Sequence, residues 1–345
     1  MDGYCDPCRR GRTKVGWPMS LVSVIMTAYN AADTIERAVR SVHGQRHRDW
    51  QLIVVDDGST DRTAEIMGRL LAELNDPRIE FVTGQPNAGL PGARNLGLAR
   101  VRGEWVTYLD SDDEYTPDRL AVMLAAATVP ETDMVVCRHI IVQMDGSRRV
   151  RGPEQPGPLA GWQVAAGILR EELTTYVWDK LYRTEVVRKL RFRPVHRAED
   201  KVYNVAAALA CRQVALVPAA LVVYYVSPAS LTWGRISSIA ETEAVQAALT
   251  RAARDFARSG PGRRAMAVSR VCAYLAVAHQ NLFQGKPVAH LRDRLGFADI
   301  CQTLLARPLF GAAGLLLKVS PPAYAVFYRR YAARSYGLTS RNRGR

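Results

Sequence analysis

Between residues 21 and 137, short apolar runs alternate with longer segments in which apolar side chains recur every three or four positions. We expect buried strands at residues 21–27, 51–55, 79–82, 105–109 and 134–137. The segments between them predict helices, including 91–101 and 118–127. We expect a capping box of Asp33 and Glu36 before the first helix, and Thr116 with Pro117 to begin helix 118–127. Strands alternating with helices predict βαβ units and a parallel sheet.

The pattern changes after residues 152–158, which are rich in turn-forming residues. We expect helices at 161–173 and 202–210 and two strands at 214–217 and 221–226. From residue 235 the chain reads as helical almost to its end, with breaks at 259–262, 285–287 and 320–322. The predicted fold class is therefore α/β, with a helical C-terminal extension.

Polar side chains follow the strands that the pattern predicts. Residues 56–61 (DDGSTD) come after the second strand, and three carboxylates, Asp110, Asp112 and Asp113, come after the fourth. Ligands of open α/β sheets bind beyond the carboxyl ends of the strands. Crowded carboxylates favour a cation, and oxygen ligands suit Mg²⁺ or Mn²⁺. The other interpretation of this segment is a solvated acidic turn.

None of the turns contains a glycine-rich phosphate-binding motif. A metal held by Asp112 would then take the place of such a loop in binding phosphate.

Charge is distributed unevenly along the 345 residues, which carry a net charge of +14. Residues 19–258 contain 29 basic and 29 acidic residues, whereas residues 259–345 contain 14 Lys and Arg against only Asp293 and Asp299. A nucleic-acid-binding protein is one class that such basicity suggests. The neutral main segment and the absence of a recognised nucleic-acid motif argue against it, so no nucleic-acid partner is expected.

The six cysteines are scattered and do not suggest a disulfide framework. Cys5 and Cys8 form a C-x-x-C pair, which supplies only half of a zinc site. This cysteine usage fits a reducing cytoplasm. Residues 1–18 are polar and lack the apolar core of a signal peptide, and no run of about 18 apolar residues predicts a membrane span.

Seven motifs together resemble the family 2 glycosyltransferases, bacterial nucleotide-sugar enzymes with the GT-A fold, over residues 21–233. They are VSVIMTAYN (22–30), IVVDDGSTD (53–61), NAGLPGARN (87–95), YLDSDD (108–113), WDKLY (178–182), AED (198–200) and YYxxxxxS (224–231, with Ser230 near the expected serine). The sequence departs from the family's pattern at Thr27, where proline is usual. The resemblance implies a GT-A-type, Rossmann-like sheet at 19–233, with a nucleotide-sugar half at 19–137 and an acceptor half at 138–233. A polar extension at 1–18 and a helical basic region at 234–345 would flank it.

The resemblance also assigns roles in the nucleotide-sugar half. Asp112 would bind the metal, Mn²⁺ or Mg²⁺. The other implied contacts to the nucleotide sugar come from Thr27, Ala28, Tyr29, Asp57, Arg94, Asp110 and Ser111. A carboxylate only accepts hydrogen bonds, so Asp57 suits the imide N–H of uracil or the amide edge of guanine. The alternative interpretations are structural: Asp57 would cap a turn or a helix, and Arg94 would form an ion pair on a helix surface.

In the acceptor half the resemblance implies an inverting reaction, which needs a base for the acceptor hydroxyl. Asp200 is the expected base, with Glu199 as its alternative or orienting partner; Asp200 as a mere helix cap is the other interpretation. Trp178 and Lys180 are expected to line the acceptor site, although Trp178 suits core packing equally well.

The tail at 304–345 combines apolar helical segments with arginines, a pattern that fits either a peripheral contact with an anionic membrane or a helical lid on the core. The resemblance predicts a cytoplasmic transferase, peripheral on the inner face of the membrane. Its donor would be a nucleotide sugar, UDP-linked by preference. Its acceptor would be a saccharide or lipid-linked sugar in surface polysaccharide or glycolipid assembly. A polyprenyl-phosphate sugar transferase is the alternative within the same class.

Overall fold

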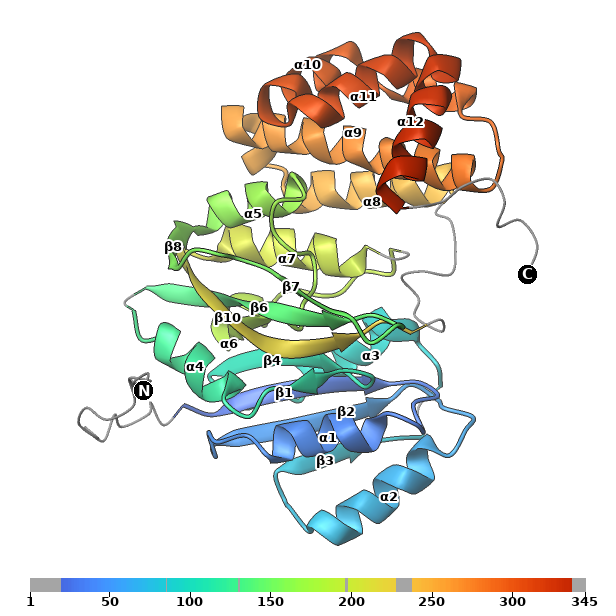
Figure 1. Cartoon of the computed structure of the whole chain (residues 1–345). Coiled ribbons are helices and arrows are strands. Elements are labelled where there is room, and N and C mark those ends of the chain that lie inside the picture. Colours follow the sequence, from blue (N-terminus) through green and yellow to red (C-terminus); the bar gives the residue numbers. More distant parts are fainter. Residues whose placement is uncertain (1–19, 85, 130, 196–197, 228–237, 337–345) are drawn as a thin grey trace, which may run out of the picture.

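The computed structural model describes residues 20–336 apart from 85, 130, 196–197 and 228–237, with side chains described as far as Arg330. One mixed sheet runs through the lower two thirds of the molecule in Figure 1, in the order β3-β2-β1-β4-β9-β6-β10-β5. The expected boundary at 233/234 and Ser230 both lie outside the described residues.

The first half of the sheet is parallel. It consists of β1 (Val22–Ala28), β2 (Trp50–Asp56), β3 (Ile79–Val82) and β4 (Trp105–Asp110). All seven residues of β1 and of β2 are buried, as in parallel strands that helices cover on both faces. The four strands expected here are therefore confirmed to within one residue at each end.

The second half of the sheet mixes directions. Strand β9 (Lys180–Arg183) runs antiparallel between β4 and β6 (Thr132–Val142), and β10 (Gln213–Tyr225) runs parallel to β6. Three short strands complete it: β5 (Glu114–Tyr115) and β8 (Gly157–Ala160) on β10, and β7 (Arg148–Arg151) on β6. The expected division of the two halves at 137/138 falls inside β6, so both halves share one continuous sheet.

Helices cover both faces of the sheet. One face carries α1 (Ile35–His43), α2 (Thr63–Leu74) and α4 (Arg119–Ala126). The other carries α3 (Gly89–Leu98), α5 (Gly161–Leu169), the short α6 (Thr184–Val187) and α7 (Glu199–Ala210). Alternate side chains of β1 enter the two cores: Val24 and Met26 pack with α1, whereas Ile25 packs beside Gly97 of α3.

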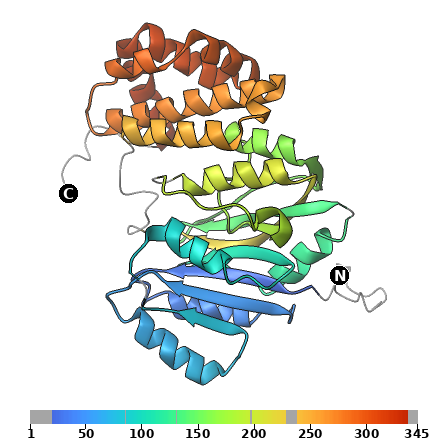
Figure 2. The ribbon, with the colours of Figure 1, turned by 180° about the vertical axis from the view of Figure 1, so that it is seen from behind.

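The C-terminal helices stack on α5 and α7, at the end of the molecule opposite α2 and β3 (Figures 1 and 2). They are α8 (Ile239–Ala252), α9 (Gly260–Phe283), α10 (Phe297–Ala306), α11 (Pro308–Val319) and α12 (Pro321–Tyr336), with 3₁₀ turns at Phe256–Arg258 and Ala289–Arg294. Their own core includes Val271, Leu291 and Leu317. Within the described part of the chain, no helix combines the length and apolarity needed to cross a bilayer.

Several local predictions were wrong. The two strands expected at 214–217 and 221–226 are one strand, β10, whose register shifts beside Pro218, a residue that cannot donate to the ladder. Helix α5 ends at Leu169, and Glu171 follows with a φ of 60°. Helix α4 begins at Arg119, one residue later than expected, and its N-cap is Asp118 in place of Thr116.

The expected capping box before α1 does not form. Thr34 is the N-cap, and the Glu36 side chain bonds Arg40 instead. The loop before α1 is held by distant partners, because Ala31 N–H donates to Thr63 Oγ1 and Ala32 N–H donates to Asp61 Oδ2.

Candidate functional site

The carboxyl ends of β1, β2 and β4 meet at one edge of the sheet. Thr27 lies in register with Val55 on one side and with Asp110 on the other. Ala28 is buried at the end of β1, and Tyr29 just beyond it is 54% exposed. Thr27 and Asp110, which are far apart in sequence, are thus neighbours at the edge where α/β sheets bind ligands.

Asp57 lies beside this edge, directly after β2. Its N–H donates to the Ala28 carbonyl at 2.9 Å, and its Oδ1 accepts from the Ala88 N–H at 2.8 Å. One carboxylate oxygen therefore fixes the turn that precedes α3. The other oxygen receives no hydrogen bond from the described part of the chain, which leaves an acceptor for a ligand N–H.

Arg94 joins the two halves of the molecule. It lies on α3, is only 2% exposed, and its Nη2 bonds Asp110 Oδ1 at 3.0 Å. Its Nη1 pairs with Asp200 and lies 3.8 Å from Glu199 Oε1. Helices α3 and α7 cover the same face of the sheet, so the first turn of α7 brings both acids to the end of β4. Glu199, Asp200 and Asp110 therefore lie around one guanidinium.

The Asp200 carboxyl is tuned by opposing influences. Burial raises its pKa to about 7; Arg94 opposes this rise, while Glu199 and Asp110 add to it. Burial disfavours the charged form of Arg94 as well, but Asp200, Asp110 and Glu199 together raise its pKa above the ordinary value. The Asp200 side chain keeps 18% exposure. A carboxylate that titrates near neutral pH and reaches solvent is suited to accept a proton from a substrate.

Asp112 follows in the turn after β4, next to the half-buried Ser111. Its carbonyl oxygen accepts from Arg37 Nη2 at 2.5 Å, and Arg37 also pairs with Glu114 at 2.9 Å. The carboxylate itself receives no ion pair from the described residues. Burial, and then the negative charge of Asp110, raise the pKa of Asp112 to about 6. A desolvated carboxylate without a counter-ion is a fitting ligand for a divalent cation.

Protein ligands alone would not form a cage for that cation, since no group of three or more His, Cys, Asp and Glu side chains gathers for a metal in the described ranges. Mg²⁺ commonly binds through one or two carboxylates and completes its shell with substrate phosphates and water. Mn²⁺ prefers the same oxygen ligands. The residues present therefore fit a metal that is bound together with a diphosphate.

Asp113 has a structural contact for which the sequence provides no signal. Its Oδ1 accepts from the Tyr225 N–H at 3.0 Å, at the end of β10. The Tyr225 ring in turn lies 4.1 Å from the Arg37 guanidinium. Asp113 and Arg37 thus hold the turn that presents Asp112.

A polar and aromatic cluster fixes α7 against the sheet. Tyr203 and Tyr108 share a hydrogen bond of 2.9 Å between their hydroxyls, and the Tyr182 hydroxyl donates to Asn204 Oδ1 at 2.6 Å. Asn204 donates in turn to the carbonyls of Thr175 and Tyr176. Because Asp200 lies one turn before Tyr203 and Asn204, these bonds set its position over the sheet edge.

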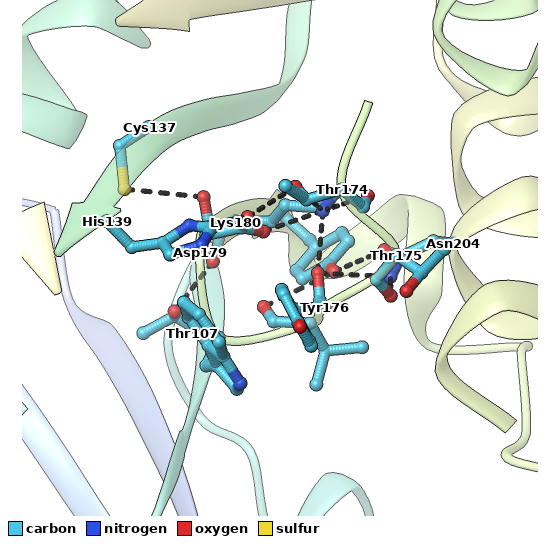
Figure 3. A network of polar contacts seen from close by, with 12 residues as sticks. Thr107, Cys137, His139, Thr174, Thr175, Tyr176, Asp179, Lys180 and Asn204 are labelled. Carbon is cyan, nitrogen blue, oxygen red and sulfur yellow. Dashed lines mark hydrogen bonds and ion pairs between the residues drawn. The ribbon is translucent and has the colours of Figure 1, made fainter. Parts of the chain in front are cut away.

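Trp178 and Lys180 do not line an acceptor surface, which corrects the sequence-based assignment. Trp178 is 1% exposed and stacks with both Tyr176 and Tyr224, at 4.5 and 5.6 Å between ring centroids. Lys180 is fully buried, and its Nζ donates to Tyr176 O and Asp179 Oδ1, both at 2.6 Å (Figure 3).

The same network includes the fully buried His139, whose Nδ1 lies 3.5 Å from Asp179 Oδ2. Burial alone would raise the pKa of Asp179. The nearby Lys180, and to a smaller extent His139, hold this pKa below its ordinary value. Aromatic and charged residues in the WDKLY motif suggested a sugar-binding surface, but they form a core that supports the sheet.

A further buried arginine was missed. Arg119, at the start of α4, is fully buried and donates through Nη2 to Thr107 Oγ1 at 2.8 Å and to the Trp178 carbonyl at 2.7 Å. It ties β4 to the segment before β9. The sequence offers no signal for it, because an arginine in the first turn of an amphipathic helix ordinarily reads as solvated.

Comparison with known proteins agrees with this arrangement. The model of the family described as "Glycosyl transferase family 2" matches residues 23–191. The succinoglycan biosynthesis protein ExoO of Rhizobium meliloti is 32% identical over 220 residues, which cover 61% of this chain and 62% of ExoO. The putative teichuronic acid biosynthesis glycosyltransferase TuaG of Bacillus subtilis is 46% identical over 104 residues, 30% of this chain and 40% of TuaG. The chain thus matches less than two thirds of the length of these relatives.

Solved glycosyltransferases share the fold. TarS 1–349 of S. aureus in complex with UDP-GlcNAc has a TM-score of 0.66 at 18% identity, over 90% of this chain and 92% of that one. The mannosyltransferase PcManGT of Pyrobaculum calidifontis, in complex with GDP-Man and Mn²⁺, has a TM-score of 0.53 at 19% identity, over 90% and 87%. Both alignments extend through the sheet and into the C-terminal helices.

Proposed function

Since this chain is a family 2 glycosyltransferase with the GT-A fold, we propose that it is an inverting, metal-dependent hexosyltransferase that uses a nucleotide-sugar donor. The observation that carries the proposal is the Arg94 bridge, which places Asp110, two residues before the proposed metal ligand Asp112, and Asp200 of the acceptor half on one guanidinium. A base and a diphosphate site are then adjacent, as a single displacement requires.

The nucleotide sugar binds along the carboxyl edge of β1, β2 and β4 in this proposal. The free oxygen of Asp57 accepts the base N–H, and exposed Tyr29 lies against the base. Asp110 and Ser111 contact the ribose side, and Asp112 holds Mn²⁺ or Mg²⁺. When bound, the cation offsets the negative charge that builds on the diphosphate as the sugar leaves. We prefer a UDP-sugar, because solved TarS complexes of the same fold contain UDP-GlcNAc and UDP.

Asp200 then acts as the general base. It takes the proton from the acceptor hydroxyl as that oxygen forms its bond to the anomeric carbon, and the bond from that carbon to the diphosphate breaks on the opposite face. Attack from the opposite face inverts the anomeric centre. Arg94 keeps Asp200 in place, and Glu199 contributes to the high pKa that makes Asp200 basic near neutrality.

The acceptor that we propose is a saccharide or a lipid-linked sugar of a surface polysaccharide or glycolipid. The relatives support this class, since their names refer to succinoglycan, teichuronic acid and colanic acid biosynthesis. We place the reaction in the cytoplasm, on the inner face of the membrane. Transfer to polyprenyl phosphate remains the alternative acceptor chemistry.

A screen of UDP-, GDP- and dTDP-sugars with Mn²⁺ tests the proposal through release of the nucleoside diphosphate. We expect turnover with one UDP-sugar, loss of turnover on chelation of the metal, and loss in Asp112→Ala. Asp255→Asn, a change at a carboxylate that is 93% exposed, is the control. Equal turnover by Asp112→Ala and the wild type would refute the metal assignment.

A further inference from the structure

Helix α11 presents an uninterrupted apolar stripe to solvent. Its inner side is closely packed, with Gly311 against Leu304 and Gly314 against Val271 and Ile300. Its outer face carries Leu309, Ala312, Leu315 and Val319, all exposed and spaced three or four residues apart. Leu309 is 85% exposed and Val319 63%. A surface helix normally buries its apolar side chains and exposes polar ones. Helix α11 instead carries apolar side chains on both its buried face and its exposed face.

The neighbouring helices also expose apolar side chains. Phe297 and Leu305 on α10 and Val326 and Phe327 on α12 are each at least 50% exposed. Among the described residues, eight of the thirteen exposed large hydrophobic side chains lie between Phe283 and Phe327. Exposed apolar residues on soluble proteins are ordinarily scattered singly, so this concentration marks an interaction surface.

The charge around the stripe is predominantly positive. Residues 289–336 contain seven basic residues and two acids, Asp293 and Asp299. Asp293 lies 3.8 Å from Arg292 Nε, and the Asp299 carboxylate accepts from both Nε and Nη2 of Arg270. Lys318 lies in the last turn of α11 over the exposed Phe297 ring, and Arg329 and Arg330 are exposed on α12. The surface therefore offers apolar side chains and cations with no uncompensated carboxylate.

We propose that the outer face of α11, together with the exposed residues of α10 and α12, lies on an anionic lipid surface. The apolar side chains enter the boundary between headgroups and acyl chains, and Lys318, Arg329 and Arg330 contact anionic headgroups. The surface lies at the end of the molecule opposite α2 and β3 (Figures 1 and 2). This inference assigns a contact surface to the membrane location proposed above. Its evidence comes from the helical region alone, so its test does not depend on the proposed reaction.

Flotation of the full chain with vesicles tests the inference. We expect the wild type to float with vesicles of phosphatidylcholine and phosphatidylglycerol, and to float much less with phosphatidylcholine alone. The variant Leu309→Asp/Val319→Asp should bind the anionic vesicles about 30-fold more weakly, because two apolar anchors are lost and two repelled charges are introduced. The matched control is Val129→Asp/Met144→Asp, which makes the same change at two exposed apolar residues of the sheet domain and should float like the wild type.

A second variant measures the electrostatic contribution to vesicle binding separately from the apolar contribution. Arg329→Gln/Arg330→Gln should weaken binding to the anionic vesicles about 10-fold and leave the residual binding to neutral vesicles unchanged. Circular dichroism confirms that each variant is folded. Equal flotation of Leu309→Asp/Val319→Asp and the wild type would overturn the inference. A concentration-dependent oligomer that the same variant abolishes, without any flotation of the wild type, would overturn it as well and identify a second copy as the occupant.

Discussion

Replacing Asp112 with asparagine should stabilise the metal-free protein while it removes the proposed metal ligand. In the folded protein, burial and the charge of Asp110 raise the pKa of Asp112 to about 6 from an ordinary value of 3.8. The folded state therefore holds a proton that the unfolded state releases. The protein loses stability as the pH rises from about 4 through about 6, and the loss is complete above that window.

The size of the effect follows from the shift. A shift of about 2 pKa units corresponds to about 3 kcal/mol, and the partial exposure of the side chain reduces the expected value to about 2 kcal/mol. Asparagine has nearly the same shape and carries no charge. The variant should therefore exceed the wild type in free energy of unfolding by about 2 kcal/mol at about pH 8, and by roughly half of that at about pH 5.

Urea unfolding of both proteins at the two pH values, with a chelator present, measures this difference. Asp255→Asn serves as the control, because its carboxylate is almost fully exposed and its removal should change the free energy of unfolding by less than about 0.5 kcal/mol. Addition of Mn²⁺ with UDP should then stabilise the wild type and not Asp112→Asn, since a ligand stabilises only the form that binds it.

Two results would refute this reasoning. If Asp112→Asn were less stable than the wild type at about pH 8, the carboxylate would be satisfied in the metal-free protein. If the difference did not depend on pH, it would not come from the charge of Asp112.

Three other changes test the bridge and the core behind it. Asp200→Asn should lower kcat by about 10²–10⁴-fold with little change in the Kd for the nucleotide. The rate of wild-type transfer should rise with pH through about 7, as Asp200 loses its proton. An unchanged kcat in the variant would assign the base to another residue, with Glu199 next to test. Arg94→Lys should move that midpoint upward, because a single ammonium cannot bond both Asp110 and Asp200 as the guanidinium does; a pH–rate profile with an unshifted midpoint would contradict it. Lys180→Met should lower the free energy of unfolding by about 3–5 kcal/mol in urea titrations, because buried Asp179 loses its counter-ion.

The sequence predicts the parallel first half of the sheet well, because buried parallel strands give continuous apolar runs that nothing else in the segment imitates. Sequence patterns that mark the ends of helices were less informative. Asp33 has the right spacing for a cap, but Asp61 and Thr63, at the start of α2, hold the loop before α1. A tertiary contact replaced the local one, and no local pattern could reveal that. The two-residue β5 and the short edge strands β7 and β8 were missed for a similar reason, since only their partners define them.

The candidate site could be predicted as two groups of residues but not as one arrangement. The order of the strands is enough to predict that Asp57, Asp110 and Asp112 lie near each other, because each follows the carboxyl end of a parallel strand. The contact between Arg94 and Asp200 spans 106 residues and depends on α3 and α7 covering the same face of the sheet. The WDKLY motif led to a wrong prediction, because its aromatic and charged residues were expected at a binding surface but are buried. Their partners in the core, such as Tyr224 and His139, lie elsewhere in the sequence.

The charges gathered at the sheet edge give the strongest physical argument for a cation in the proposed reaction. Asp110, Glu199 and Asp200 lie around the guanidinium of Arg94. Asp112 follows two residues after Asp110, and Arg37, which lies beside it, is already paired with Glu114. Three carboxylates thus share one cation and Asp112 has none. Burial, together with the neighbouring negative charges, raises the pKa values of Asp112 and Asp200. A nucleotide diphosphate would add further negative charge to the same edge. Its binding must therefore bring a positive charge with it, and Asp112, the acid without an ion pair among the described residues, is where that charge would be held.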